Sequence, residues 1–317
     1  RSHKSLRCIT MAVKGLFVLL LVVCAMSAGA QATSLGDGFW RTLTDALLGN
    51  APALPLTIAD AEAQGWYAMN EGVCDTSLGI RYAQNSNQVT EDAPLTLYYT
   101  ASGMISGSAM DIWGEGAAPQ NLIDMGFWIP VKNTTDQWTV SVSFRNATNL
   151  CSASYSSDEV MGDQLVINQG SIAFNVPLTA AEAYCDNWFP GSCMETMGQH
   201  WFFDVESAPY PSWQSANLLP IVAMYYPPDE TGTLSTFFYT TPSVQPGSAL
   251  LSNPGDWEPA ITGDQMCYNF CDDSCHWDVP KWNTLHMYVN SQWSYIGCPN
   301  GGFPLDRACP TPFVETC

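Results

Sequence analysis

Three histidines, His200, His276 and His286, are the side chains best suited to acid–base or metal chemistry. An imidazole titrates near neutral pH, and its nitrogens bind divalent ions. Asp204 follows His200 by four residues, so these two could act as a general base and its orienting carboxylate, with His286 as a third catalytic group. The three histidines with Asp204 are also a candidate site for zinc or another divalent ion, although no H-x-H or H-E-x-x-H spacing occurs. Ordinary surface or hydrogen-bonding histidines are the alternative that the sequence leaves open.

Common hydrolase motifs are absent from the sequence. No G-x-S-x-G elbow occurs, and adjacent carboxylates such as Asp272 and Asp273 point to different sides of a strand, which is poor geometry for a glycosidase. No EF-hand loop occurs either. Loose calcium contact through surface carboxylates remains an expectation from the charge alone.

Tryptophans are the candidate ligand contacts, because an exposed aromatic face offers a large contact area at little entropic cost. Six of the twelve recur at matched or nearly matched positions of the repeat described next, as core residues do. Trp40, Trp213, Trp277 and Trp293 have no clear counterpart. Trp213, Trp277 and Trp293 are therefore predicted to contact a small molecule or a glycan.

An internal repeat positions these residues. Four landmarks recur in the same order: a Pro-Leu-Thr motif followed by a tryptophan, a cysteine five residues before a glycine, a Trp-x-Pro motif, and a strand. The Pro-Leu-Thr motif is at 55–57, before Trp66, and again at 177–179, before Trp188. The cysteine and glycine are Cys74 with Gly79 and then Cys193 with Gly198. The Trp-x-Pro motif is at 128–130 and 257–259, and the strand is at 139–144 and 284–289. The sequence predicts two β-rich repeats, 35–155 and 160–300, and a C-terminal tail, 301–317.

The two copies differ in their polar residues. All three mature histidines lie in the second copy, and the first copy has Arg81 in place of His200 and Ser141 in place of His286. A fold that forms with arginine or serine there does not need histidine for packing. His286 falls on the polar face of its strand, so we expect it outside the core. Since the second copy also carries a cysteine-rich insert at 258–281, we expect any site to lie there.

Each copy is predicted to begin with a two-turn helix, 58–64 and 180–186. Capping boxes start the helices, residues that tolerate a left-handed conformation end them, and a tryptophan folds back on each. The capping boxes are Thr57 with Asp60 and Thr179 with Glu182. The left-handed residues are Gly65 and Asn187, and the tryptophans are Trp66 and Trp188.

Most of the remaining chain is predicted to form strands, from period-2 alternation and β-branched or aromatic runs. The predicted strands are 95–100, 105–113, 138–144, 172–176, 219–226 and 234–240. A further helix is predicted over 37–49, with Phe39, Leu43 and Leu47 on one side. The expected fold is mainly β with short helices: two tandem homologous β-rich domains, sandwich- or barrel-like and disulfide-bonded.

The repeat predicts two disulfides. Cys74 and Cys193 are equivalent, and Cys151 and Cys298 each follow the last matched strand. If the copies share a fold, Cys74–Cys151 and Cys193–Cys298 are equivalent bridges. The pairing of the other mature cysteines cannot be assigned from the sequence; these are Cys185, Cys267, Cys271, Cys275, Cys309 and Cys317.

Residues 1–30 are predicted to form a leader with a secretory signal peptide, because a lysine precedes an apolar run and small residues follow it. This leader holds no acidic residue, so the mature chain is more acidic than the net charge of -20. Such acidity excludes a nucleic-acid footprint, and no later apolar run is long enough to span a membrane. Two sequons, at Asn133 and Asn146, are candidate glycosylation sites of a secreted protein.

These observations favour a secreted, acidic, extracellular binding protein with its ligand-facing site in the second repeat. The alternative is a secreted oxidoreductase or hydrolase with a histidine-containing site in the same repeat, with a divalent metal as a candidate cofactor. A further alternative is a calcium-associated extracellular matrix protein that acts through its bulk acidity.

Overall fold

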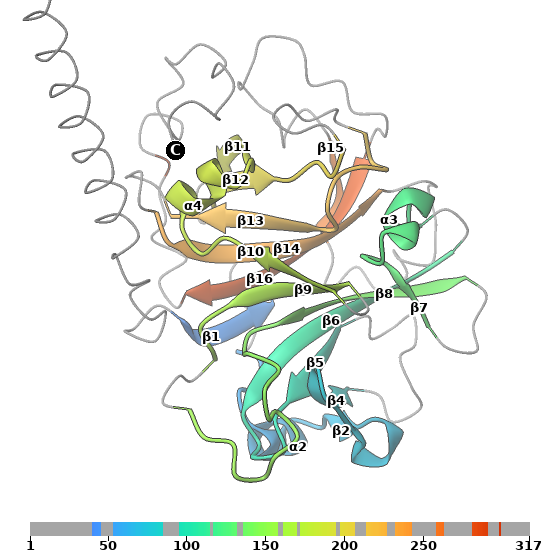
Figure 1. The fold of residues 1–317 in the computed structure, drawn as a ribbon, viewed down its shortest axis with the longest axis vertical. Helices are drawn as coiled ribbons and strands as arrows, with labels where there is room; N and C mark the ends of the chain where they lie inside the picture. The colour runs from blue at the N-terminus through green and yellow to red at the C-terminus, as the bar shows by residue number, and fades with distance from the viewer. Residues whose placement is uncertain are drawn as a thin grey trace, which may run out of the picture.

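The protein is mostly β, as the sequence predicts. The computed structural model describes residues 40–45, 53–84, 95–114, 117–131, 136–157, 161–169, 172–194, 197–206, 214–226, 232–242, 258–262, 281–290 and 298. Two antiparallel sheets, one of nine strands and one of seven, make up most of this part of the chain (Figure 1). The expected sandwich- or barrel-like arrangement and the domain boundaries stay predictions.

The first sheet has the order β10-β9-β8-β6-β5-β4-β2, with β3 beside β4 and β7 beside β8. Its strands are β2 (Tyr67–Ala68), β3 (Cys74–Asp75), β4 (Gly79–Ala83), β5 (Leu95–Tyr99), β6 (Ile105–Trp113), β7 (Ile129–Pro130), β8 (Gln137–Ser143), β9 (Leu165–Gln169) and β10 (Ile172–Val176). The helices of this part are α2 (Ile58–Ala63), the single turn η1 (Asn70–Gly72) and α3 (Gln120–Asp124).

The second sheet has the order β1-β16-β14-β13-β12-β11, with β15 beside β16. Its strands are β1 (Trp40–Asp45), β11 (Phe189–Met194), β12 (Gly198–Phe202), β13 (Ile221–Tyr225), β14 (Leu234–Pro242), β15 (Glu258–Thr262) and β16 (Lys281–Asn290). Helix α4 (Ala180–Cys185) precedes β11.

The predicted helices α2 and α4 form with the predicted caps. Thr179 and Glu182 make the full capping box, whereas the shorter Asp60 side chain accepts a hydrogen bond from the Thr57 hydroxyl instead of reaching the backbone. Trp66 donates its backbone N–H to Ala61 at the end of α2, and this folds the tryptophan into the core.

Both sheets also share their strand register and their tight turns. Gly79 and Gly198 have φ angles of 110° and 109°, and a side chain at either would collide with the carbonyl of the tyrosine on the next strand. That tyrosine donates its hydroxyl to a proline carbonyl in each copy: Tyr99 to Pro55 at 2.8 Å and Tyr225 to Pro177 at 2.7 Å. The repeat therefore corresponds to one folding pattern used twice.

The prediction of a helix over 37–49 is wrong, because residues 40–45 form strand β1. The apolar spacing of this segment fits a helix, but Thr42 and Thr44 are β-branched and suit a strand. β1 pairs with β16, which lies near the other end of the sequence, so the deciding contacts are nonlocal.

Each copy supplies its first strand to the sheet of the other. β1 pairs with β16 of the second sheet, and β9 pairs with β8 of the first (Figure 1). The registers match: Thr44 lies opposite Tyr288 and Val166 lies opposite Ser143. Val166 is as far beyond Thr44 in the sequence as Thr179 is beyond Thr57, so β1 and β9 are equivalent strands with exchanged partners.

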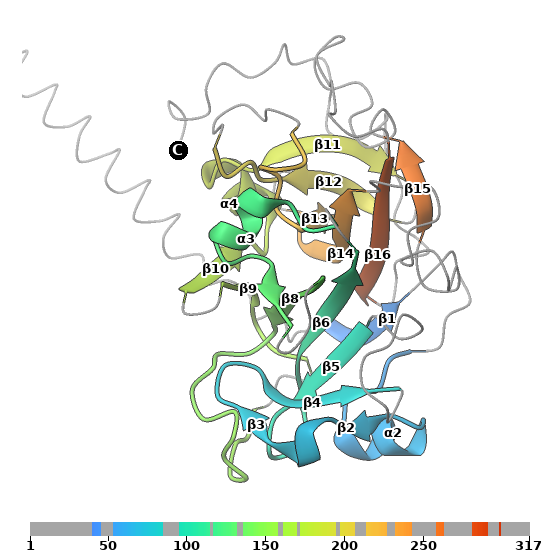
Figure 2. The same ribbon diagram turned by 90° about the vertical axis from the view of Figure 1, so that its right-hand side faces the viewer.

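The core lies between the two sheets, where β6 meets β14 (Figure 2). The Ser108 and Tyr239 hydroxyls are 2.6 Å apart, and the Phe144 ring lies 6.1 Å from the Phe237 ring. The buried apolar residues of both copies form a single cluster. This shared cluster and the contacts between β6 and β14 join the two copies.

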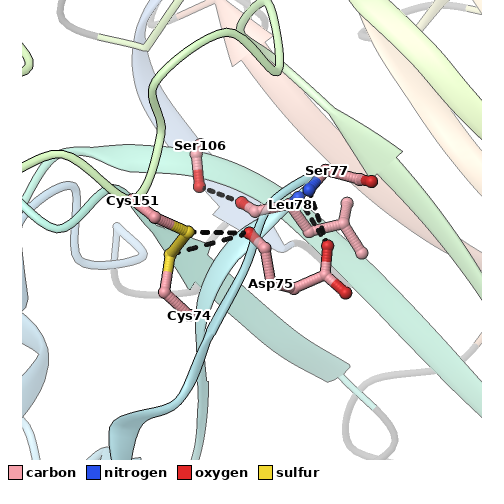
Figure 3. The surroundings of a disulfide bond; sticks show 6 residues. All are labelled: Cys74, Asp75, Ser77, Leu78, Ser106 and Cys151. Atoms are coloured by element: carbon pink, nitrogen blue, oxygen red, sulfur yellow. Dashed lines mark hydrogen bonds between the residues drawn. A yellow bond between two sulfur atoms is a disulfide. The ribbon is translucent and has the colours of Figure 1, made fainter.

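Both predicted disulfides are present. Cys74–Cys151 has a Cα–Cα distance of 5.7 Å, and Cys193–Cys298 has one of 5.8 Å. Near the first bridge the Asp75 carboxylate accepts the Ser77 backbone N–H at 2.7 Å, which turns β3 into β4 (Figure 3). Cys185 is also disulfide-bonded. Within the described ranges, no helix has the length and apolar character that crossing a membrane requires.

Candidate functional site

A row of ring side chains in contact with one another crosses the second sheet on the face opposite the shared core. His200 lies 6.2 Å from Phe202 and 5.6 Å from Phe238, between ring centroids. His286 lies 4.8 Å from Phe238 and 6.2 Å from Tyr288. Strands β12, β14 and β16 supply these rings, and each ring residue is at most 2% exposed. We call these five residues the ring row.

The ring row carries no charge at His286. Burial, and secondarily the neighbouring His200 imidazole, lower the pKa of His286 to about 3. Its imidazole is therefore neutral at physiological pH, with one donor and one acceptor nitrogen. A base this weak is poorly matched to proton abstraction at neutral pH.

The expectation that His286 lies outside the core is wrong, because His286 is 1% exposed. Alternation places it correctly on the opposite face from Leu285 and Met287, which belong to the shared core. That opposite face is buried as well, and His200 on it is also 1% exposed. Periodicity separates two faces of a strand but does not reveal whether the second is covered.

Asp204, the predicted partner of His200, is buried after the end of β12. Its carboxylate accepts the Glu206 backbone N–H at 2.9 Å, and its backbone forms an isolated bridge with Leu218. These contacts give Asp204 a role in the local turn, while the His200 ring packs between Phe202 and Phe238.

A metal site that joins the predicted histidines gains no support from the described residues, among which no group of three or more His, Cys, Asp or Glu side chains could hold an ion. His200 and His286 both contact Phe238, whose strand lies between theirs in the sheet. His276 lies outside the described residues, as do the predicted ligand contacts Trp213, Trp277 and Trp293.

The first sheet has an ion pair at the corresponding place. Arg81, which matches His200, donates to Asp111 at 2.8 Å and to the Thr96 hydroxyl at 3.2 Å. The Asp111 side chain is fully buried, and this burial raises its pKa although the Arg81 guanidinium opposes the shift. Burial also raises the pKa of Tyr98 to about 12. Sequence reasoning missed this pair, and the available signal was a carboxylate within the otherwise uncharged segment that forms β6.

Of the two predicted glycosylation sites, Asn133 lies outside the described residues. Asn146 is exposed in the turn that follows β8. Its side-chain oxygen accepts the Thr148 hydroxyl at 2.7 Å and the Thr148 backbone N–H at 2.9 Å. The acceptor nitrogen of this sequon is thus presented on the surface.

Comparison with protein-family models, with curated proteins and with solved structures found no match.

Proposed function

We propose that the protein is an extracellular binding protein whose ligand site lies in the second repeat. The observation that carries this proposal is the ring row, which stands where the first repeat has an ion pair and small side chains. Phe238 and His286 correspond in strand register to Ala109 and Ser141. The two sheets form alike with either set, so the rings are not needed to specify the shared fold.

The ring row favours an uncharged ligand that contains a ring. Aromatic faces stack on such ligands, and a neutral imidazole can donate one hydrogen bond and accept another. A sugar meets both requirements, in line with the small-molecule or glycan partner expected from the sequence. Since the rings are buried, a ligand that reaches them would have to enter the fold instead of lying on its surface.

The enzyme alternative has less support. His286 is a very weak base at a pKa of about 3, and the Asp204 carboxylate is engaged in its own turn. The calcium-matrix alternative rests on net charge alone. Disulfides fit an oxidising compartment, and the exposed Asn146 sequon fits the same secretory route, so we also propose that Asn146 carries a glycan.

The test is native mass spectrometry of the secreted protein with a panel of neutral mono- and oligosaccharides. We expect a one-to-one adduct with the wild-type protein. A variant that carries the first-repeat residues, Phe238→Ala with His286→Ser, should lose the adduct. Met125→Ser is the matched control, because Met125 is an exposed apolar residue far from the ring row in the sequence. The same spectra report glycan mass and any bound metal.

Three outcomes would contradict the proposal. The double variant could bind as the wild type does, the wild type could form no adduct with any neutral sugar, or it could convert the sugar to a product. Conversion, or one tightly bound divalent ion, would favour the enzyme alternative. Near-ultraviolet circular dichroism must show that the double variant keeps its tertiary structure.

A further inference from the structure

The exchange of first strands between the repeats determines what kind of partner the edge of each sheet accepts. β1 pairs with β16 on the side opposite β14, and β9 pairs with β8 on the side opposite β6. A single repeat therefore carries one donor strand and one acceptor edge that do not meet each other. Only a second repeat can satisfy both.

The way the chain connects these strands differs greatly between the two sheets. β9 follows β8 directly in strand order, whereas β1 and β16 are the first and last strands among the described residues. The register is nevertheless equivalent, with Thr44 opposite Tyr288 and Val166 opposite Ser143. The surfaces of the strands, and not the peptide connection, thus determine the pairing.

Contacts beyond the strands also join the repeats. The Thr241 hydroxyl donates to the Ala117 carbonyl at 2.6 Å, and Ser108 shares its buried hydrogen bond with Tyr239. At the edge of the first sheet, the Phe127 ring of the first repeat lies 5.7 Å from the Phe174 ring of the second. These contacts belong to one buried core, as in an obligate protein interface.

We infer that the chain is a strand-exchanged pair of repeats fused into one polypeptide, and that the interface between the repeats holds without the peptide link. The partner that the β16 edge fits is the first strand of another repeat, added antiparallel in the register of β1. This arrangement is that of a strand-swapped dimer whose two subunits have become consecutive in sequence.

The test is to cut the link in the folded full-length protein. A protease site inserted between Ser157 and Met161 separates the repeats after β8 and before β9. In a chain expressed from residue 31, the two fragments cannot be held by a disulfide, because residues 31–157 contain only Cys74 and Cys151, which bond to each other. After cleavage we expect both fragments to elute together in size-exclusion chromatography and to separate in denaturant. Separate elution in native buffer would overturn the inference.

Two cysteine pairs test the exchange itself. Thr44→Cys with Tyr288→Cys, and Ser143→Cys with Val166→Cys, each place thiols at paired positions on different fragments. Oxidation should keep the cleaved fragments joined on a non-reducing gel, and a peptide digest of the uncut chain should contain the same bridge. Thr44→Cys with Thr284→Cys, which is out of register, should not cross-link. Absence of both in-register bridges from folded protein would overturn the inference.

Discussion

The two sheets are alike on their shared inner faces and different on their outer faces. On the first sheet the buried outer face holds Arg81 and Asp111 in an ion pair. On the second sheet the same face holds His200, Phe238 and His286 as rings in edge-on and tilted contact. Turn glycines, tyrosine-to-proline hydrogen bonds, disulfides and strand register nevertheless match between the two.

This contrast separates the residues that build the fold from those that give each repeat its chemistry. Features present in both copies, such as the Tyr99 and Tyr225 hydrogen bonds, are needed for the common backbone. Outer-face residues differ in charge and size although the backbone around them is the same. The outer faces are therefore where the repeats have separate roles, and the following experiments test that division.

The disulfides should show the largest effect and the least difference between repeats. Cys74→Ser with Cys151→Ser, and Cys193→Ser with Cys298→Ser, remove bridges with sequence separations of 77 and 105 residues. Each loss should lower the free energy of unfolding by about 4 to 5 kcal/mol, and the two losses should differ by about 0.3 kcal/mol because loop entropy grows only logarithmically. Denaturant unfolding measures both, and strongly unequal losses would contradict the equivalence of the bridges.

Breaking the ion pair of the first sheet should be nearly as costly. Arg81→Met leaves a fully buried carboxylate at Asp111 without its partner and should cost about 3 to 5 kcal/mol at pH 7. Asp111→Leu added to Arg81→Met should recover most of that loss. A double variant as unstable as the single one would contradict the assignment.

The cost of Arg81→Met should also depend on pH. The pKa of Asp111 is raised in the folded protein, so its ionised form costs stability above that pKa and the cost disappears as the carboxyl takes up a proton. We expect the defect to be smaller at pH 4 than at pH 7 in urea unfolding. A defect that grows on acidification would contradict the prediction.

His286 should give the second sheet the opposite pH dependence. Its folded pKa of about 3 lies below the unfolded value, so the unfolded chain binds a proton first as the pH falls below about 6.5. Stability should fall by about 1.4 kcal/mol for each pH unit from this group, down towards the folded pKa. His286→Ser, which installs the first-repeat residue, should remove that part of the slope. Equal slopes for wild type and variant between pH 6 and pH 4 would contradict it.

The smallest effect should come from the matched tyrosines. Tyr99→Phe and Tyr225→Phe each remove one hydroxyl and leave a proline carbonyl unsatisfied, at about 1 to 2 kcal/mol. Because both belong to the common backbone, the two losses should agree within about 0.5 kcal/mol by thermal or denaturant unfolding. Clearly unequal losses of unfolding free energy would show that one of the two tyrosines has a role specific to its repeat.

Several parts of the fold were predictable because their signals are local or repeated. The caps at Thr57 and Thr179 are short-range hydrogen bonds, and the helices start where those caps predict. The pairing of Cys74 with Cys151 follows from comparing two copies, which cysteine counting alone cannot supply. Strand β1 was missed since its partner lies near the far end of the chain.

The candidate site was only partly predictable. The asymmetry between His200 and Arg81 was visible in the sequence, and it pointed to the second copy. The contacts of His200 and His286 with Phe238 were not visible, because they join three strands of one sheet. The Arg81–Asp111 pair likewise joins residues on β4 and β6 that are brought together by β5.

The sequence by itself determined the β-rich class, the two-copy organisation, the helix caps and the two bridges. Each is encoded by neighbouring residues or by landmarks that recur in the same order, so each can be recognised without the tertiary structure. Tertiary structure alone decided that each repeat completes the other's sheet, and that the described side chains on both faces of β12, β13, β14 and β16 are buried. Strand pairing and burial depend on which distant surfaces meet, and no local pattern carries that information.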